Sequence, residues 1–163
     1  MGVVISVFLL VRFGMLMKHA SLITIVFAVS TLLFAQNTKA ASTDTAFDGT
    51  WSVTVNAHEY QNADGSTALA WVIHFPAEVK NGVLHGEHGT RGAAGWYELD
   101  GKMETNGTAI LRTNGITSDP EHAERHVHFG TSYEYQVNAH FNGQHGTGKS
   151  VGPRIRIFTF VKD

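Results

Sequence analysis

Cysteine is absent from this 163-residue chain, and charged residues make up only 16% of it. The lack of cysteine excludes a disulfide scaffold and a zinc module held by thiolates. The low charge content excludes a strongly charged disordered tail. Stability therefore has to come from packing, and a domain of about 120 residues buries enough surface to form a core without cross-links.

Catalytic signatures are missing as well. The sequence contains no Gly-x-Ser-x-Gly nucleophile motif and no glycine-rich phosphate loop that leads into a helix. It also lacks a paired acidic motif with supporting context. We therefore expect a protein that is not an enzyme and that needs no cofactor.

The N-terminal region has the pattern of an export signal. Lys18 provides a positive start, residues 20–35 form an uncharged apolar run, and small residues at Thr38 and Ala40 suit a signal peptidase. We place cleavage after Ala40, with Ala35 as a second possible site.

This pattern divides the chain into residues 1–40, a signal peptide or N-terminal apolar segment, and residues 41–163, a single domain. An uncleaved anchor stays open as an alternative, because the two apolar runs around Lys18 together exceed the roughly 20 residues that span a bilayer. In both cases the domain is exported, so we expect it to be periplasmic or secreted.

The exported domain is acidic. Arg12, Lys18 and Lys39 precede residue 41, which leaves 9 of the 12 basic residues against all 14 acidic ones, a net charge of 9 − 14 = −5 with histidine neutral. Because an acidic surface repels phosphate groups, we expect no nucleic-acid partner. Membrane contact is expected only through an uncleaved N-terminus, and the sequence identifies no protein partner.

Short runs of alternating apolar and polar residues fill the domain, with turn signals between them. Asn81-Gly82, Asn106-Gly107 and Asn142-Gly143 predict three hairpins, because Asn-Gly favours the positive φ angles of a type I′ turn. Asp64-Gly65 predicts a fourth turn. The expected strands cover residues 49–59, 67–79, 82–90, 95–104, 108–117, 127–142 and 145–162, the last of these broken near Gly152-Pro153.

About eight strands and almost no helix predict an all-β fold, an antiparallel up-and-down barrel. Closure into a barrel leaves no unpaired strand edge, whereas a two-sheet sandwich would need longer cross-connections. One turn of helix is expected over residues 119–126, with Asp119 as its cap and Pro120 at its start. The core candidates share faces of the first two strands: Trp51, Val53 and Val55, then Leu69, Trp71, Ile73 and Phe75.

The first strand opens with Gly49-Thr50-Trp51, and in this the chain resembles the calycin superfamily of lipocalin-like and avidin-like barrels. The resemblance implies that the first and last strands meet. It also implies that Arg154 or Arg156 stacks on Trp51, as the last-strand arginine of lipocalins does. The avidin contacts to biotin have no counterparts in this chain, so biotin binding is not implied.

Residues 47–53, 83–89 and 146–149 also resemble segments of small exported proteobacterial proteins of unknown function. This resemblance covers most of the domain. It implies an exported barrel and no particular activity.

A ligand site in the barrel interior is predicted from an excess of aromatic residues over what a small core needs. The residues proposed to contact a ligand are Trp71, Phe75, Trp96, Arg91 and Phe158. Arg91 belongs to a glycine-rich loop at one barrel end, where loops carry recognition and glycine allows close approach to a small molecule. A flexible hairpin connection explains the same glycines equally well.

Histidines are densest at His122, His126 and His128. A helical turn would direct the first two the same way, and imidazole is a ligand for zinc and copper. A solvated polar loop is the competing interpretation.

Three functions follow from these observations. The leading hypothesis is an exported, noncatalytic barrel that binds a small apolar or amphipathic ligand in its interior. The alternative is a periplasmic protein-interaction or inhibitor module with a solid core. The third is a metal-binding protein that uses the histidine cluster.

Overall fold

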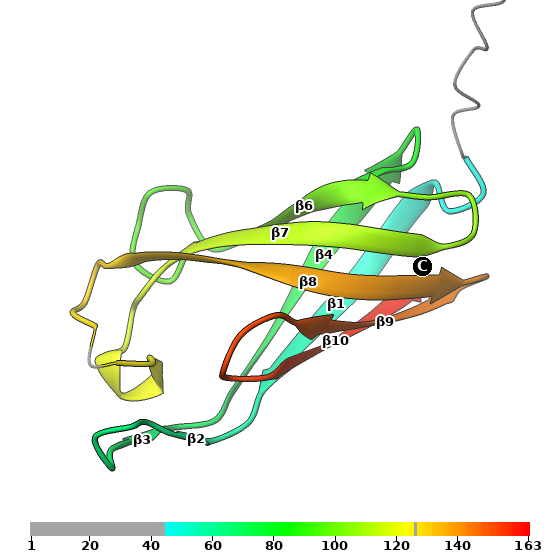
Figure 1. Cartoon of the computed structure of the whole chain (residues 1–163). Helices are drawn as coiled ribbons and strands as arrows, with labels where there is room; N and C mark the ends of the chain where they lie inside the picture. Colours follow the sequence, from blue (N-terminus) through cyan, green and yellow to red (C-terminus); the bar gives the residue numbers. More distant parts are fainter. Residues whose placement is uncertain (1–44, 126) are drawn as a thin grey trace, which may run out of the picture. The chain divides into compact units, whose positions relative to one another are not determined.

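Figure 1 shows the computed structural model, which describes residues 45–125 and 127–163. The predicted signal over residues 1–40 lies outside the described residues. Within the described part of the chain, no helix is long and apolar enough to cross a membrane.

Eight antiparallel strands close into a barrel in the order β1-β10-β9-β8-β7-β6-β5-β4. From β4 to β10, each strand pairs with the next one along the chain, and β1 closes the barrel by pairing with both β4 and β10. The predicted all-β, up-and-down barrel is therefore confirmed. The barrel strands are β1 (Gly49–Ala57), β4 (Trp71–Lys80), β5 (Val83–His88), β6 (Tyr97–Met103), β7 (Thr108–Ile116), β8 (Ser132–Asn142), β9 (His145–Ser150) and β10 (Arg156–Lys162).

Two minor elements lie in the connections. β2 (Tyr60–Gln61) and β3 (Thr67–Ala68) form a small hairpin that contains the predicted Asp64-Gly65 turn. A single 3-10 turn, η1 (Pro120–His122), begins after Asp119, whose side chain accepts a hydrogen bond from the Glu121 backbone N–H. The helical turn predicted here is confirmed, at a shorter length.

Alternation along the strands sets the inside and outside of the barrel. In β1, Trp51, Val53 and Val55 are at most 1% exposed, while the residues between them are not buried. Phe75 in β4 is also buried, as predicted. Leu69 departs from the prediction, because it precedes β4 and is 38% exposed.

The three Asn-Gly hairpins form, but through different turns. At Asn81-Gly82 both residues have positive φ angles, 54° and 71°, as a type I′ turn requires. At Asn142, by contrast, the asparagine pairs with His145 as the last residue of β8, and Gly143 has a φ of 60° at the first turn position. Glycine at that position is typical of a type II′ turn. The type I′ prediction thus holds at Asn81-Gly82 and is wrong at Asn142-Gly143. It is also wrong at Asn106-Gly107, where only the glycine has a positive φ angle, 82°.

The barrel has two unlike ends, which lie to the right and left in Figure 1. The closed end carries the tight turns that join β4 to β5, β6 to β7, and β8 to β9. The open end carries four longer connections: residues 58–70, 89–96, 117–131 and 151–155.

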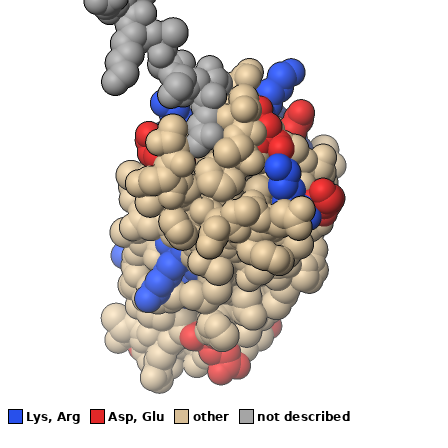
Figure 2. All heavy atoms as spheres, turned by 90° about the vertical axis from the view of Figure 1, so that its right-hand side faces the viewer, with Lys and Arg blue, Asp and Glu red and all other residues tan. Residues whose placement is uncertain are grey.

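Aromatic rings fill the closed end. Phe141 packs edge-on against Trp51 at a centroid distance of 5.3 Å and against Phe160 at 4.7 Å. The Trp51 indole N–H donates to the Phe47 carbonyl at 2.9 Å, so no buried polar atom of this ring is left unpaired. Figure 2 looks onto this end, where charges of both signs are scattered among a largely uncharged surface.

The prediction that Arg154 or Arg156 stacks on Trp51 is wrong. Lys162 holds the cation position instead, with its Nζ 5.9 Å from the centroid of the Trp51 ring. Arg154 lies just before β10 and Arg156 is the first residue of β10, so both are at the open end. β10 runs antiparallel to β1, so its first residues meet the last residues of β1 rather than Trp51.

Candidate functional site

A cavity of about 530 Å³ occupies the open end of the barrel. Its walls come from inward-facing residues of β4, β6, β8 and β10, and its rim comes from the connections at this end. The residues that shape it most are Trp71, Ile73, Tyr97, Tyr133, Tyr135 and Arg156. The barrel is therefore packed at one end and hollow at the other.

Gly115 explains part of this hollow. It pairs with Tyr133 across β7 and β8, and a Cβ at Gly115 would lie only 2.3 Å from the Tyr133 Cζ. Because glycine has no side chain, the tyrosine ring lies flat against the barrel wall at this point. Tyr133 also stacks beside Tyr135, with an interplanar angle of 8°. The two rings line one wall without crossing the interior.

The floor of the cavity is a pair of tyrosine hydroxyls. The hydroxyls of Tyr97 and Tyr135 lie 2.8 Å apart and share a hydrogen bond, and Phe75 packs behind Tyr97 at a centroid distance of 5.6 Å. Burial raises the pKa of Tyr97 and Tyr135 above the ordinary value for tyrosine. Both side chains are therefore neutral at physiological pH.

Tyr133 adds a further hydroxyl to the wall. Burial raises the pKa of Tyr133 as well, so its hydroxyl keeps its proton and can donate to a ligand.

Arg156 brings a charge to the same wall. Its guanidinium lies 4.3 Å from the centroid of the Tyr135 ring, and its Nη2 donates to Glu124 at 2.7 Å. Its Nε is buried and has no hydrogen-bond partner in the described part of the chain. The side chain is 13% exposed, so water screens this charge weakly.

Arg154 holds the rim together. It is fully buried, and its guanidinium donates to the backbone carbonyls of His58, Leu69 and His122 at 3.0, 2.6 and 2.6 Å. These carbonyls belong to two different connections of the open end. Arg154 therefore fixes the cavity entrance by hydrogen bonds rather than by apolar packing.

The structure separates the five predicted ligand residues. Trp71 lines the cavity, whereas Phe75 lies behind its floor and Phe158 is fully buried in the core. Arg91 and Trp96 lie together over the outer face of β5 and β6, where Arg91 contacts Trp96 at 5.0 Å and forms an ion pair with Glu87.

The predicted histidine cluster is only partly described. His122 lies at the cavity rim, with its Nδ1 3.2 Å from the Leu69 carbonyl oxygen. His128 is exposed, and His126 lies outside the described residues. The proposed metal site therefore stays a prediction.

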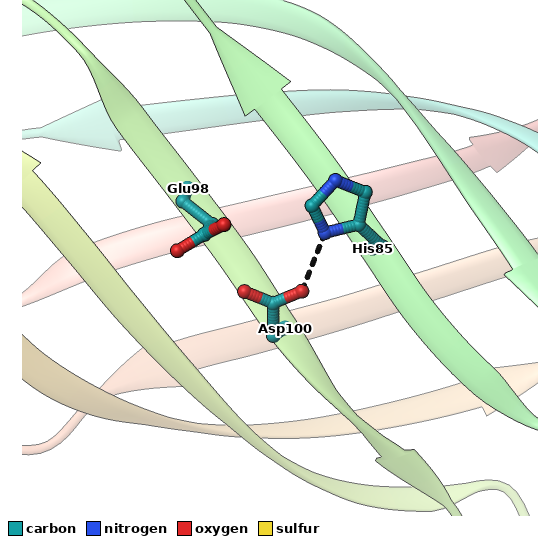
Figure 3. A group of neighbouring side chains, drawn as sticks. All are labelled: His85, Glu98 and Asp100. Carbon is teal, nitrogen blue, oxygen red and sulfur yellow. Dashed lines mark hydrogen bonds and ion pairs between the residues drawn. The ribbon is translucent and has the colours of Figure 1, made fainter. Parts of the chain in front are cut away.

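A different group in the described chain has the composition of a metal site. His85, Glu98 and Asp100, on neighbouring strands β5 and β6, place one ligand atom each within 4.8 Å of one another (Figure 3). These ligand atoms already form hydrogen bonds and ion pairs with one another and with neighbouring side chains. The His85 Nδ1 lies 2.6 Å from Asp100, and Glu98 pairs with Arg91.

The Asp100 hydrogen bond raises the pKa of His85, although partial burial opposes the shift. When it is protonated, His85 forms an ion pair with Asp100 on the outside of the barrel.

Sequence reasoning missed most of the cavity. Tyr133 and Tyr135 were not among the predicted ligand residues, although the alternation in residues 132–142 places both on the inward face with Val137. That alternation was the available signal. Comparison with models of known families, with curated proteins and with solved structures found no match for the chain.

Proposed function

We propose that this chain is an exported, noncatalytic barrel that binds a small apolar or amphipathic ligand in the open-end cavity. The cavity carries the proposal. Its volume of about 530 Å³ lies within the range of about 300–1,000 Å³ that is typical of small-molecule sites. A barrel built only for protein contacts has no need of such a space.

The walls indicate an amphipathic ligand. Trp71 and Ile73 present an apolar surface from β4, while Tyr133, Tyr135 and Arg156 present ring faces and polar groups from β8 and β10. Aromatic faces supply contact area at low entropic cost, and a few polar groups orient the ligand. The export signal inferred from residues 1–40 supports a role outside the cytoplasm.

The test uses N-phenyl-1-naphthylamine, a neutral amphipathic dye whose fluorescence rises in apolar surroundings. We expect saturable binding to the intact protein. Ile73→Trp should abolish it, because the added ring occupies the cavity from β4. Val72→Trp is the matched control, since Val72 directly precedes Ile73 on the same strand but is 51% exposed on the outer face.

Folding of both variants is checked by circular dichroism and thermal unfolding. Loss of dye binding in the Ile73 variant alone supports the cavity site. Absence of saturable binding in the unmodified protein, or equal loss in both variants, would contradict the proposal and favour the protein-interaction alternative.

A further inference from the structure

We infer that the ligand of the open-end cavity is an amphipathic organic anion, with its acidic group bound at the Arg156 guanidinium. This inference rests on the proposed function and names the chemical class of the ligand. It comes from the balance of buried charges around the cavity.

Two arginines with little solvent exposure lie near a single carboxylate of low exposure. Arg156 is paired with Glu124, whose side chain is 18% exposed. Arg154, fully buried, donates only to backbone carbonyls in the described chain. These three side chains therefore carry two positive charges and one negative charge.

The two guanidinium groups also affect one another. Burial, followed by the positive charge of Arg156, lowers the pKa of Arg154. Placing unbalanced charge in a weakly solvated site is costly, and an anion bound nearby would reduce that cost.

Other charges near the cavity are screened by water. Asp119 and Arg125 lie at the rim, where the Asp119 side chain is 50% exposed and Arg125 is exposed. Glu134 points outward and pairs with Arg112 on the outer face. Because solvent weakens the interactions of exposed charges, the buried arginines determine the sign that the cavity prefers.

Arg156 has the geometry to bind an anion. Its plane lies on the Tyr135 ring, which orients the guanidinium, and its Nε has no hydrogen-bond partner in the described part of the chain. One of its remaining contacts is long, from Nη1 to the Arg154 carbonyl at 3.3 Å. A guanidinium binds planar acids through two parallel hydrogen bonds, so a ligand carboxylate would replace or share the contact with Glu124.

The experiment compares two dyes that differ by one anionic group. 8-Anilinonaphthalene-1-sulfonate has the skeleton of N-phenyl-1-naphthylamine with a sulfonate added. We expect the intact protein to bind the anionic dye at least about tenfold more tightly, as one hydrogen-bonded charge pair predicts. Arg156→Met should remove this preference while the neutral dye still binds.

Two further variants make the result specific. Glu124→Gln should strengthen binding of the anionic dye, because it frees Arg156 from its carboxylate partner. Arg112→Met removes an equal charge from the outer face and should leave the affinity for both dyes unchanged. Thermal unfolding confirms that each variant is folded, so that sulfonate dye bound to unfolded chains is not counted.

The possible failures are distinguishable. Equal affinity for the two dyes, or equal losses in the Arg112 and Arg156 variants, would overturn the anion inference and leave the cavity function standing. Absence of binding for both dyes would instead overturn the proposed function itself.

Discussion

At the closed end, Trp51, Phe141 and Phe160 meet in the centre of the barrel, whereas at the open end Tyr133 and Tyr135 lie along the wall and leave a cavity. Both ends are built from the same alternation of inward and outward residues. The ends differ in how their large inward rings are oriented and in how their connections are held. Alternation therefore decides which side chains face inward, but not whether they fill the interior.

Inward glycines show the difference most directly. Gly146 lies beneath Phe141, where a Cβ would be 2.6 Å from the ring. Gly115 lies beneath Tyr133 in the same way, at 2.3 Å. At the closed end the ring is surrounded by other rings, while at the open end its other side faces the cavity. An inward glycine beneath an aromatic ring thus allows close packing at one end and leaves space at the other.

The largest loss of stability that we expect comes from Arg154→Met, which would loosen the connections of the open end and leave the closed end intact. The substitution removes the guanidinium that donates to three backbone carbonyls, of which only that of Leu69 has a second partner among the described residues, the His122 Nδ1. We expect a loss of about 2–4 kcal/mol, less than the sum of three charged hydrogen bonds because the cost of burying the charge also disappears.

Hydrogen exchange measured by mass spectrometry checks where the loss occurs. Amides of residues 58–70 and 117–131 should lose protection, while β1 near Trp51 keeps it. Arg112→Met, which breaks only an exposed ion pair, is the control. Uniform loss of protection at both ends would show that the two ends unfold as one unit.

We expect losses of stability of intermediate size from substitutions at two inward glycines, one at each end of the barrel. Gly146→Ala should cost about 1–3 kcal/mol, because the Phe141 ring has no free space to move into. Gly115→Ala should cost less than about 1 kcal/mol, because Tyr133 can shift into the cavity instead of overpacking a core.

Urea unfolding measures both stabilities, and titration with N-phenyl-1-naphthylamine measures the cavity. We expect weaker dye binding only in the Gly115 variant, since the displaced ring takes up ligand space. If the two variants lost equal stability, the open end would be as tightly packed as the closed end.

The smallest effect concerns the outer face, away from either end. The pKa of His85 lies above its ordinary value of 6.5, so the folded protein holds this proton more tightly than the unfolded chain does. The resulting stability is fully present below pH 6.5 and is lost as the pH rises through the folded pKa.

His85→Gln should therefore lower the free energy of unfolding at pH 5 by at most a few tenths of a kcal/mol, roughly the effect of an exposed ion pair, and leave it unchanged at pH 9. Urea unfolding at the two pH values checks this. His140→Gln, on the outer face of β8, is the comparison variant. An equal effect of the His85 substitution at both pH values would exclude the ion pair as its cause.

Much of the fold was predictable because its signals are local. Three Asn-Gly dipeptides and the alternation around Trp51 were enough to predict hairpins, strand faces and a closed barrel. The strand expected from residue 127 begins at Ser132 instead, because the preceding residues form a turn and the rim of the open end. Even the turn types differed, since the register at Asn142 moves the glycine to the first turn position.

The candidate site was much less predictable. Of the five predicted ligand residues only Trp71 lines the cavity, because an aromatic side chain looks the same in sequence whether it packs in the core or lines a space. Either Arg154 or Arg156 was expected at Trp51, but the antiparallel pairing of β1 with β10 places both at the other end.

The sequence by itself determined most of the residues that face inward, where the chain turns and that residues 45–125 and 127–163 are almost entirely strands and turns, because each of these depends on neighbours within a few positions. Only the tertiary structure decided which inward residues form a solid core and which surround a cavity. It also decided that two arginines lie there near a single carboxylate. Those outcomes depend on the register of strands distant in sequence and on barrel closure, which bring Arg156, Glu124 and Tyr135 together.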